Sequence, residues 1–279
     1  MHTADRVTLA RLPSGVPVET TVHRYGRGEP TVYVQAAQHG REINGVECCR
    51  RLHERLTDPA VDGPDAADLD GTLIVVPVAD PLTFDRVSYT TPEPIDSANP
   101  NLNRCWPGDS DGTLHQRVAA TLWDYAGEAD AIVDLHTGSP EMLTHTVYLR
   151  GDDDSRRLAA AFGTDVLLAE AAGDDADTEW HERNFGGKLR VAATREGIPS
   201  ITPELGSTAW LASVASSACS PASPSRGTAF ARATTSAGSG RPTPGCSFPT
   251  TASNSGVRSP PAIRSARSTT RRPTNPSRP

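Results

Sequence analysis

Hydrophobic and polar positions follow two alternating patterns along residues 1–206. Short apolar, β-branched runs predict strands at 31–37, 72–80, 130–138, 146–151, 165–171 and 198–206. Between them, apolar residues recur at helical spacing, which predicts helices over 43–56, 113–129, 155–163 and 186–197. Strands that alternate with helices favour the α/β class, with a mostly parallel sheet covered by helices on both faces.

The ends of the predicted strands carry chemically active residues. His39 follows the strand 31–37, His136 ends the strand 130–138, and Glu204 lies near the end of 198–206. Ligands of open parallel sheets gather at the carboxyl ends of the strands, so we expect these residues to meet there. The turn-rich excursion over 81–112 is long for a compact domain, which favours a functional or a disordered loop.

The pattern stops near Gly206. All 34 acidic residues lie at or before Glu204, which gives the first part a net charge of −16. The 73 residues after Gly206 hold nine arginines and no acid, and Ser, Pro, Thr, Ala and Gly dominate them. We therefore predict a folded domain over 1–206 and a low-complexity, disordered basic tail over 207–279.

Two explanations of the tail remain. It is either a native basic segment with weak nucleic-acid affinity, or the product of a wrong reading frame in a GC-rich gene. We favour the second explanation because the acidic bias disappears at one residue. A nucleotide sequence that encodes an acidic, periodic segment of about a hundred residues in another frame would support it.

Composition places the domain in a reducing, aqueous compartment. No signal pattern is present, and the longest apolar runs are far shorter than the ~20 residues of a membrane span. The five cysteines form no CxxC pair, which favours reduced thiols. The acidic first part contains a single lysine, so it suits a halophile cytoplasm, although a GC-rich genome alone also gives acidic proteins. We expect a cytoplasmic protein with no membrane and no nucleic-acid partner.

Three of these residues form a candidate metal site. His39 and Glu42 stand in an HxxE motif, which alone is common by chance as a loop histidine beside a helix-capping glutamate. With His136, they give two imidazoles and one carboxylate, the ligand set of a catalytic zinc ion that keeps a position for water. Asp134 lies two residues before His136 and either orients its ring or caps a helix.

Five motifs in order resemble the succinylglutamate desuccinylase/aspartoacylase family of the zinc-carboxypeptidase-like superfamily. They span about Thr31 to Gly206 and read "QHGREINGVE", "VPVADPLTFDRVSY", "NPNLNRCWPGDSDGTLHQRVA", "DLHTG" and "PELG". The resemblance implies a three-layer α/β/α carboxypeptidase-like domain. It also implies one Zn²⁺ per chain, held by His39, Glu42 and His136, with Glu204 as the catalytic acid-base.

The resemblance assigns substrate binding to Asn103 and Arg104 of the family's "DLNR" motif. The family's usual Asp is Asn101 here, which leaves the local role of that position open. Arg86 and Arg190 are further candidate contacts for a substrate anion.

The implied function is a zinc-dependent hydrolase, or deacylase, acting on carbon-nitrogen bonds other than peptide bonds in linear amides. Its substrate would be a small N-acyl amino acid or a related amide. Two alternatives stay open: a metallocarboxypeptidase-type peptidase, and a truncated, frame-shifted product with little activity or a basic-tailed binding protein. The acyl group, the amine and the oligomeric state are left open by the sequence.

Overall fold

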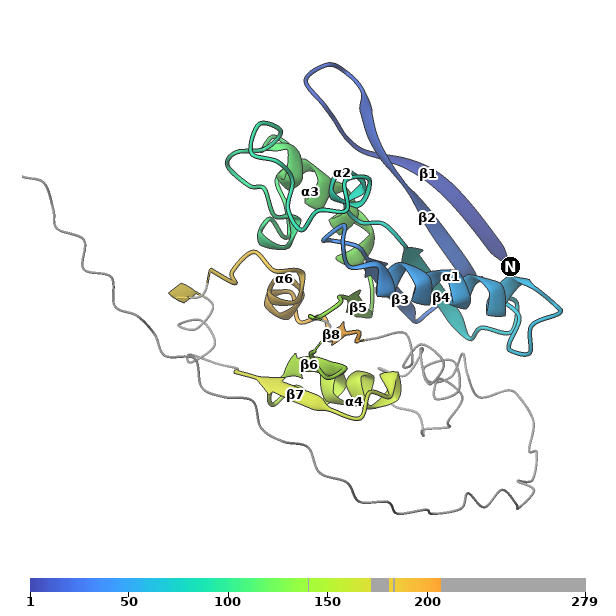
Figure 1. The fold of residues 1–279 in the computed structure, drawn as a ribbon. Coiled ribbons are helices and arrows are strands. Elements are labelled where there is room, and N and C mark those ends of the chain that lie inside the picture. Colours follow the sequence, from blue (N-terminus) through green and yellow to red (C-terminus); the bar gives the residue numbers. More distant parts are fainter. Residues whose placement is uncertain (140, 172–180, 183, 207–279) are drawn as a thin grey trace, which may run out of the picture. The chain divides into compact units, whose positions relative to one another are not determined.

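An eight-stranded sheet forms the centre of the domain in the computed structural model, which describes residues 1–206 except 140, 172–180 and 183. The strands lie in the order β1-β2-β4-β3-β5-β8-β6-β7. The hairpin β1–β2 lies at one end of the sheet and β6–β7 at the other (Figure 1). The strands span β1 His2–Arg11, β2 Pro17–Arg27, β3 Thr31–Ala36, β4 Gly71–Val76, β5 Ala131–Leu135, β6 His145–Leu149, β7 Leu167–Glu170 and β8 Ser200–Glu204.

The sheet is parallel in its centre and mixed at its ends. Strands β4, β3, β5 and β8 run parallel to their neighbours in this series, whereas β2 pairs with β4 and β6 pairs with β8 in antiparallel fashion. The prediction of an α/β fold is confirmed. No strand is predicted before residue 31, so the antiparallel hairpin β1–β2 is an addition to the predicted elements.

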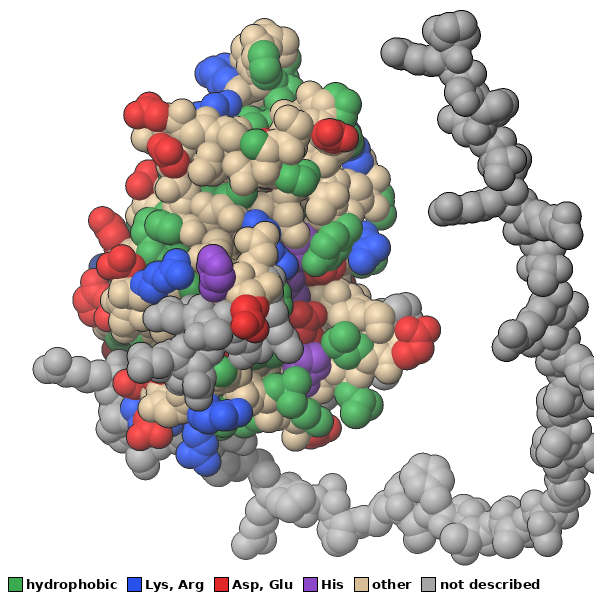
Figure 2. Space-filling model, turned by 90° about the vertical axis from the view of Figure 1, so that its left-hand side faces the viewer, with side chains coloured by type: hydrophobic (Ala, Val, Ile, Leu, Met, Phe, Trp, Pro, Cys, Tyr) green, Lys and Arg blue, Asp and Glu red, His purple; other side chains and the backbone are tan. Residues whose placement is uncertain are grey.

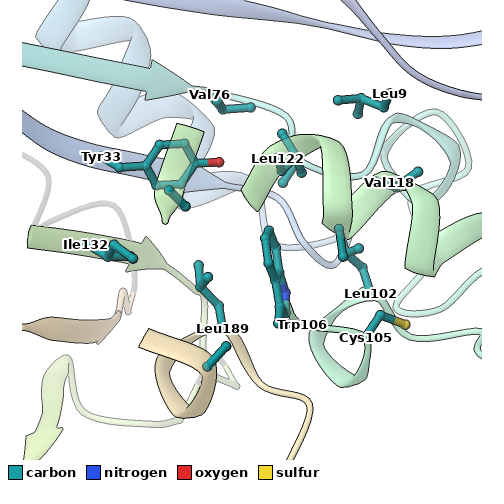
Figure 3. Close-up of a cluster of buried hydrophobic side chains, with 14 of the residues drawn as sticks. Leu9, Tyr33, Val76, Leu102, Cys105, Trp106, Val118, Leu122, Ile132 and Leu189 are labelled. Carbon is teal, nitrogen blue, oxygen red and sulfur yellow. The ribbon is translucent and has the colours of Figure 1, made fainter. Parts of the chain in front are cut away.

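Helices cover both faces of the sheet and make three layers. On one face, α1 packs against β3 and α4 packs against β6 and β8, over a core that includes Val34, Val133 and Ile201. On the other face, α3 and α6 enclose a second core in which Trp106 stands between Leu102 and Leu189 (Figure 3). The helices span α1 Ile43–Thr57, α2 Pro81–Phe84, α3 Leu114–Ala126, α4 Asp153–Phe162 and α6 Leu189–Arg195, with a 3-10 helix η1 at Leu102–Arg104.

The excursion over 81–112 is ordered and contains α2 and η1. Its anchor is the buried His115 at the start of α3. Nε2 of His115 lies 3.1 Å from Oδ2 of Asp80 and 3.0 Å from Oγ1 of Thr91, and Nδ1 lies 2.7 Å from the carbonyl oxygen of Asn99. The start of the excursion and two residues in its middle are thereby tied to one imidazole, which itself belongs to the helix that follows the excursion.

Three further predictions concern the tail, the cysteines and the absence of a membrane-spanning helix. The tail predicted over 207–279 lies outside the described residues. Within the described residues, Cys48, Cys49 and Cys105 are free cysteines, and no helix has the length and apolar character needed to cross a membrane.

Candidate active site

The parallel strands bring the candidate residues to one edge of the sheet. His39 lies in the turn after β3, Glu42 is the residue before α1, and His136 directly follows β5. Strands β3 and β5 are neighbours, and His136 forms a parallel bridge with Glu204 at the end of β8. The prediction that residues at strand ends meet in space is confirmed.

Glu42 lies between the two histidines. Its Oε1 is 2.8 Å from Nδ1 of His39, and its Oε2 is 2.9 Å from Nδ1 of His136. All three side chains are buried, and one ligand atom from each lies within 4.8 Å of the others. Glu42 makes no side-chain cap on α1, so its carboxylate is directed at the histidines rather than at the helix.

Each imidazole is held through its other nitrogen. Nε2 of His136 lies 3.0 Å from Oδ2 of Asp134, and Nε2 of His39 lies 3.2 Å from Oδ1 of Asn101. Asp134 is itself held by Gln38, whose Nε2 donates to both carboxylate oxygens. Asp134 therefore orients the His136 ring, and Asn101 supplies an acceptor to His39 although it replaces an aspartate.

The chemistry of this donor set fits a divalent cation. A carboxylate and an amide oxygen accept hydrogen bonds, so they place the proton of each neutral ring on Nε2 and leave the lone pair on Nδ1. Both Nδ1 lone pairs then face the acceptor oxygens of Glu42, an arrangement that requires a proton or a metal ion between them. Outer partners of this kind are typical of histidines that bind metals.

Charge in the cluster agrees with this requirement. Although burial lowers the pKa of His136, the charges of Asp134 and Glu42 raise it overall. Burial alone raises the pKa of Glu42, but hydrogen bonds from His136 and His39 outweigh it and hold the pKa at about 2. The buried carboxylates therefore favour positive charge at the position between the rings.

The cluster opens into a cavity of about 150 Å³ that also contains Glu204. Histidine and acidic side chains lie together near the middle of the face shown in Figure 2. Burial raises the pKa of Glu204, and the nearby charge of Glu42 adds to this, partly offset by His136. A carboxyl group with a raised pKa, in the same cavity as a metal-type cluster, is suited to proton transfer.

The rest of the cavity wall is cationic. Arg104, Lys188 and Arg190 line it. Burial and the charge of Arg190 together lower the pKa of Lys188 to about 8. Arg190 is only 4% exposed and pairs with Glu170, yet its Nε and Nη1 have no hydrogen-bond partner among the described residues. The cavity thus presents buried donors suited to an anion.

The predicted substrate-binding residues divide into two groups. Asn103, Arg104 and Arg190 line the cavity, and Nδ2 of Asn103 lies 3.4 Å from Nε2 of His136. Arg86 does not line it: this side chain is exposed and donates to the carbonyl oxygen of Leu82. Arg86 follows the end of α2, and its hydrogen bond to Leu82 turns the side chain back toward that helix and away from the cavity.

Four further residues of the site were missed in the sequence. Tyr89 stacks on His39 with ring centroids 3.9 Å apart, and Lys188 lines the cationic wall. Trp106 donates from Nε1 to Oε1 of Gln38 at 2.7 Å and so fixes the amide that holds Asp134. Their signals were weak: Gln38 adjoins His39 and Trp106 follows the "NLNR" motif, but neither residue type indicates metal chemistry by itself.

The fold and the cluster define a carboxypeptidase-like domain with a His-Glu-His site. The model of the succinylglutamate desuccinylase/aspartoacylase catalytic domain matches residues 28–219, so the chain belongs to this family. The match ends shortly after the change of composition at Gly206. The family resemblance predicted from the five motifs is confirmed.

Individual relatives agree with the family. The chain is 31% identical over 209 residues to an N-alpha-acetyl-L-2,4-diaminobutyric acid deacetylase of Halomonas elongata, covering 68% of this chain and 54% of the relative. It therefore spans about half the length of that enzyme. Deacylases are thus found among its relatives.

Two solved structures have the same fold. The product-bound ectoine utilization protein of Ruegeria pomeroyi has 25% identity and a TM-score of 0.57, covering 76% of this chain and 63% of that one. A metallo-carboxypeptidase of Burkholderia cenocepacia has 18% identity and a TM-score of 0.54, with coverage of 82% and 63%. The second likeness concerns the fold alone, and it agrees with the predicted carboxypeptidase-like architecture.

Proposed function

We propose that this protein is a zinc-dependent amidohydrolase that removes the acyl group from a small N-acyl amino acid. The observation that carries the proposal is the buried cluster of His39, Glu42 and His136, which shares a cavity with Glu204. Membership of a family named for a desuccinylase and an acylase supports the reaction class.

His39, Glu42 and His136 would hold the ion, with one Zn²⁺ in this cluster. When bound, such an ion polarises a carbonyl group and lowers the pKa of a water molecule toward ~7. Asp134 and Asn101 keep the two rings in the orientation that presents Nδ1. Tyr89 covers one face of His39 and reduces its contact with solvent.

Glu204 acts as the proton-transfer group. The pKa of the Glu204 carboxyl is raised toward neutral pH. The carboxylate therefore accepts a proton from the attacking water and returns it to the leaving amine. The bond between the carbonyl carbon and the amide nitrogen breaks. The oxygen of the water goes to the acyl group, which leaves as a carboxylate, and both protons of the water go to the nitrogen, which leaves as an ammonium group. Among the described residues that line the cavity, the other carboxylates are already paired: Glu42 with His39 and His136, Asp134 with His136, and Glu170 with Arg190. Glu204 is therefore the carboxylate available for this role.

The cationic wall binds the carboxylate of the amino-acid part. Arg104 and Arg190 offer planar pairs of N–H donors that match a carboxylate, and Lys188 adds a point charge. The cavity of about 150 Å³ is smaller than the ~300–1,000 Å³ of sites for drug-sized ligands, which favours a small substrate. A deacetylase of an acetylated diamino acid among the relatives supports the same substrate class.

The test compares zinc-loaded protein with its Glu204→Gln variant. Amine release is measured from N-acetyl and N-succinyl amino acids, and from peptides with free C-termini. We expect turnover of an N-acyl amino acid, a loss of about 10²–10⁴-fold in kcat for Glu204→Gln, and unchanged zinc content in that variant.

Each other outcome has a defined meaning. Faster cleavage of peptides than of N-acyl amino acids would replace the deacylase with a carboxypeptidase. Zinc binding without any hydrolysis would favour an inactive product, and failure to bind zinc at micromolar concentration would refute the metal site itself.

A further inference from the structure

A second group of histidines lies outside the cavity. Among the described residues, two groups of three side chains are placed to hold an ion. The first is the cluster in the cavity, and the second consists of His2, His23 and His53. These residues come from β1, β2 and α1. His2 is paired with Tyr25 across the hairpin, and His23, two residues before Tyr25, lies on the same face of β2. Helix α1 covers this face and contributes His53.

The distances between these rings suit metal ligation. Nε2 of His2 lies 3.1 Å from Nδ1 of His23, and the His53 ring centroid is 5.0 Å from that of His2 and 5.5 Å from that of His23. In a tetrahedral zinc site with Zn–N distances of ~2.0–2.1 Å, two ligand nitrogens are about 3.3 Å apart. The His2–His23 separation is close to that edge.

We propose that His2, His23 and His53 form a second metal site that binds one divalent transition ion of the Zn²⁺ class. Three imidazoles with no carboxylate select ions that prefer nitrogen ligands over Mg²⁺ and Ca²⁺, which prefer oxygen. The remaining coordination position is left to water or to a ligand from solution.

The surroundings meet the other requirements of a metal site. The Tyr25 hydroxyl lies 2.9 Å from Nδ1 of His53 and orients that ring. That contact occupies Nδ1 and leaves Nε2 of His53 as the nitrogen that can bind the ion.

An ion also has a route to the cluster. His23, Tyr25 and His53 line a cavity of about 450 Å³ between β2 and α1, separate from the cavity that contains Glu204. The hairpin contacts α1 through this cluster, so a bound ion would link the first strand of the chain to the helix that follows the His39 turn.

The two metal sites are separated by a set of variants. Tag-free protein is loaded with Zn²⁺, passed through a desalting column and analysed for zinc by mass spectrometry. We expect two ions per chain in the unaltered protein, one in His39→Ala, one in His53→Ala, and none in the double variant. His181→Ala removes an exposed histidine outside both groups and should retain two ions.

Affinity and spectrum give an independent readout. In the His39→Ala background, competition with a chromophoric chelator should show that His53→Ala or His23→Ala weakens zinc binding by more than about tenfold. Co²⁺ loaded in the same background should give the visible bands of a four-coordinate, nitrogen-ligated ion, and His53→Ala should abolish them.

Other results would overturn the proposal. A His39→Ala chain that holds no zinc, or one whose zinc survives His53→Ala, would reduce the cluster to packed aromatic rings. Circular dichroism checks that each variant folds, so a loss of zinc through unfolding would be recognised. If His53→Ala unfolds, the zinc content of the His23→Ala variant decides whether the cluster binds zinc.

Discussion

Nε2 of His39 lies 3.2 Å from Oδ1 of Asn101, and this contact determines which ring nitrogen faces Glu42. The same oxygen accepts from the backbone N–H of Asn103 at 2.9 Å, which fixes the orientation of the amide. An asparagine therefore performs the orienting role of the aspartate that the family resemblance implies at this position. What the asparagine lacks is the negative charge.

This relationship predicts opposite effects for two substitutions. Asn101→Asp keeps the acceptor and adds charge, so it should leave zinc affinity equal or tighter. Asn101→Leu removes the acceptor and should weaken zinc binding by about 10–100-fold. Chelator competition measures both constants, and an unchanged constant in Asn101→Leu would show that His39 needs no partner at Nε2.

Arg190 provides a test of substrate recognition. Arg190→Lys keeps the positive charge beside Glu170 but loses the planar pair of donors, so KM for a carboxylate-bearing substrate should rise about tenfold to a hundredfold. kcat should change much less. Steady-state kinetics with an N-acyl amino acid, and with its carboxamide analogue, measures the effect.

Arg86→Lys is the matched control for that variant. Arg86 is exposed and lies outside the cavity, so the kcat and KM of the Arg86→Lys variant should match those of the unaltered protein. Equal effects of the two substitutions would remove Arg190 from the binding site.

Gly187 lies just before α6 and packs closely against the backbone of Arg104 in η1. A Cβ at Gly187 would lie 2.0 Å from the carbonyl oxygen of Arg104, whereas one at Gly186 would meet only an arginine end group at 3.7 Å. Gly187→Ala should therefore displace Arg104, lower the free energy of unfolding by about 1–3 kcal/mol and raise KM, and Gly186→Ala should do neither. Urea denaturation and steady-state kinetics check the pair; equal tolerance of both would contradict the close approach.

His115 gives a prediction for stability against pH. Burial lowers the pKa of His115, but the hydrogen bond and charge of Asp80 outweigh it and raise the pKa above 6.5. A group with a raised folded pKa stabilises fully below its unfolded pKa, and this stabilisation is lost as pH rises through the folded pKa. The free energy lost in His115→Gln should therefore be larger at pH 6 than at pH 9.

His115 is buried and His181 is exposed, and this difference sets the expected cost of replacing each. Loss of the hydrogen bonds that join Asp80 and Asn99 to the ring should cost about 1–3 kcal/mol at pH 6. His181→Gln, at an exposed position, should cost within about 0.5 kcal/mol at either pH. A penalty for His115→Gln that grows with pH would contradict the charged pair.

The strands predicted from the sequence account for the described sheet except for the N-terminal hairpin β1–β2. Each strand from β3 onward was expected, because buried strands give apolar runs that stand out against helical spacing. Strands β1 and β2 were missed, since they are rich in Thr and Arg, and most positions of β1 and several of β2 are exposed. Their hairpin is evident only when the register across the turn is known.

The candidate site divides in the same way. His39, Glu42 and His136 were predicted because imidazole and carboxylate at strand ends carry their chemistry in the residue type. The roles of Gln38 and Trp106 depend on contacts between segments 68 residues apart, which local spacing does not reveal. His2, His23 and His53 also lie on three separate elements and form no motif.

The most direct measurement is the anomalous scattering of zinc in crystals of the tag-free protein grown with Zn²⁺. The account predicts a peak within about 2.0–2.2 Å of Nδ1 of His39, Nδ1 of His136 and a carboxylate oxygen of Glu42. Zinc-loaded crystals without a peak at these three atoms would contradict it.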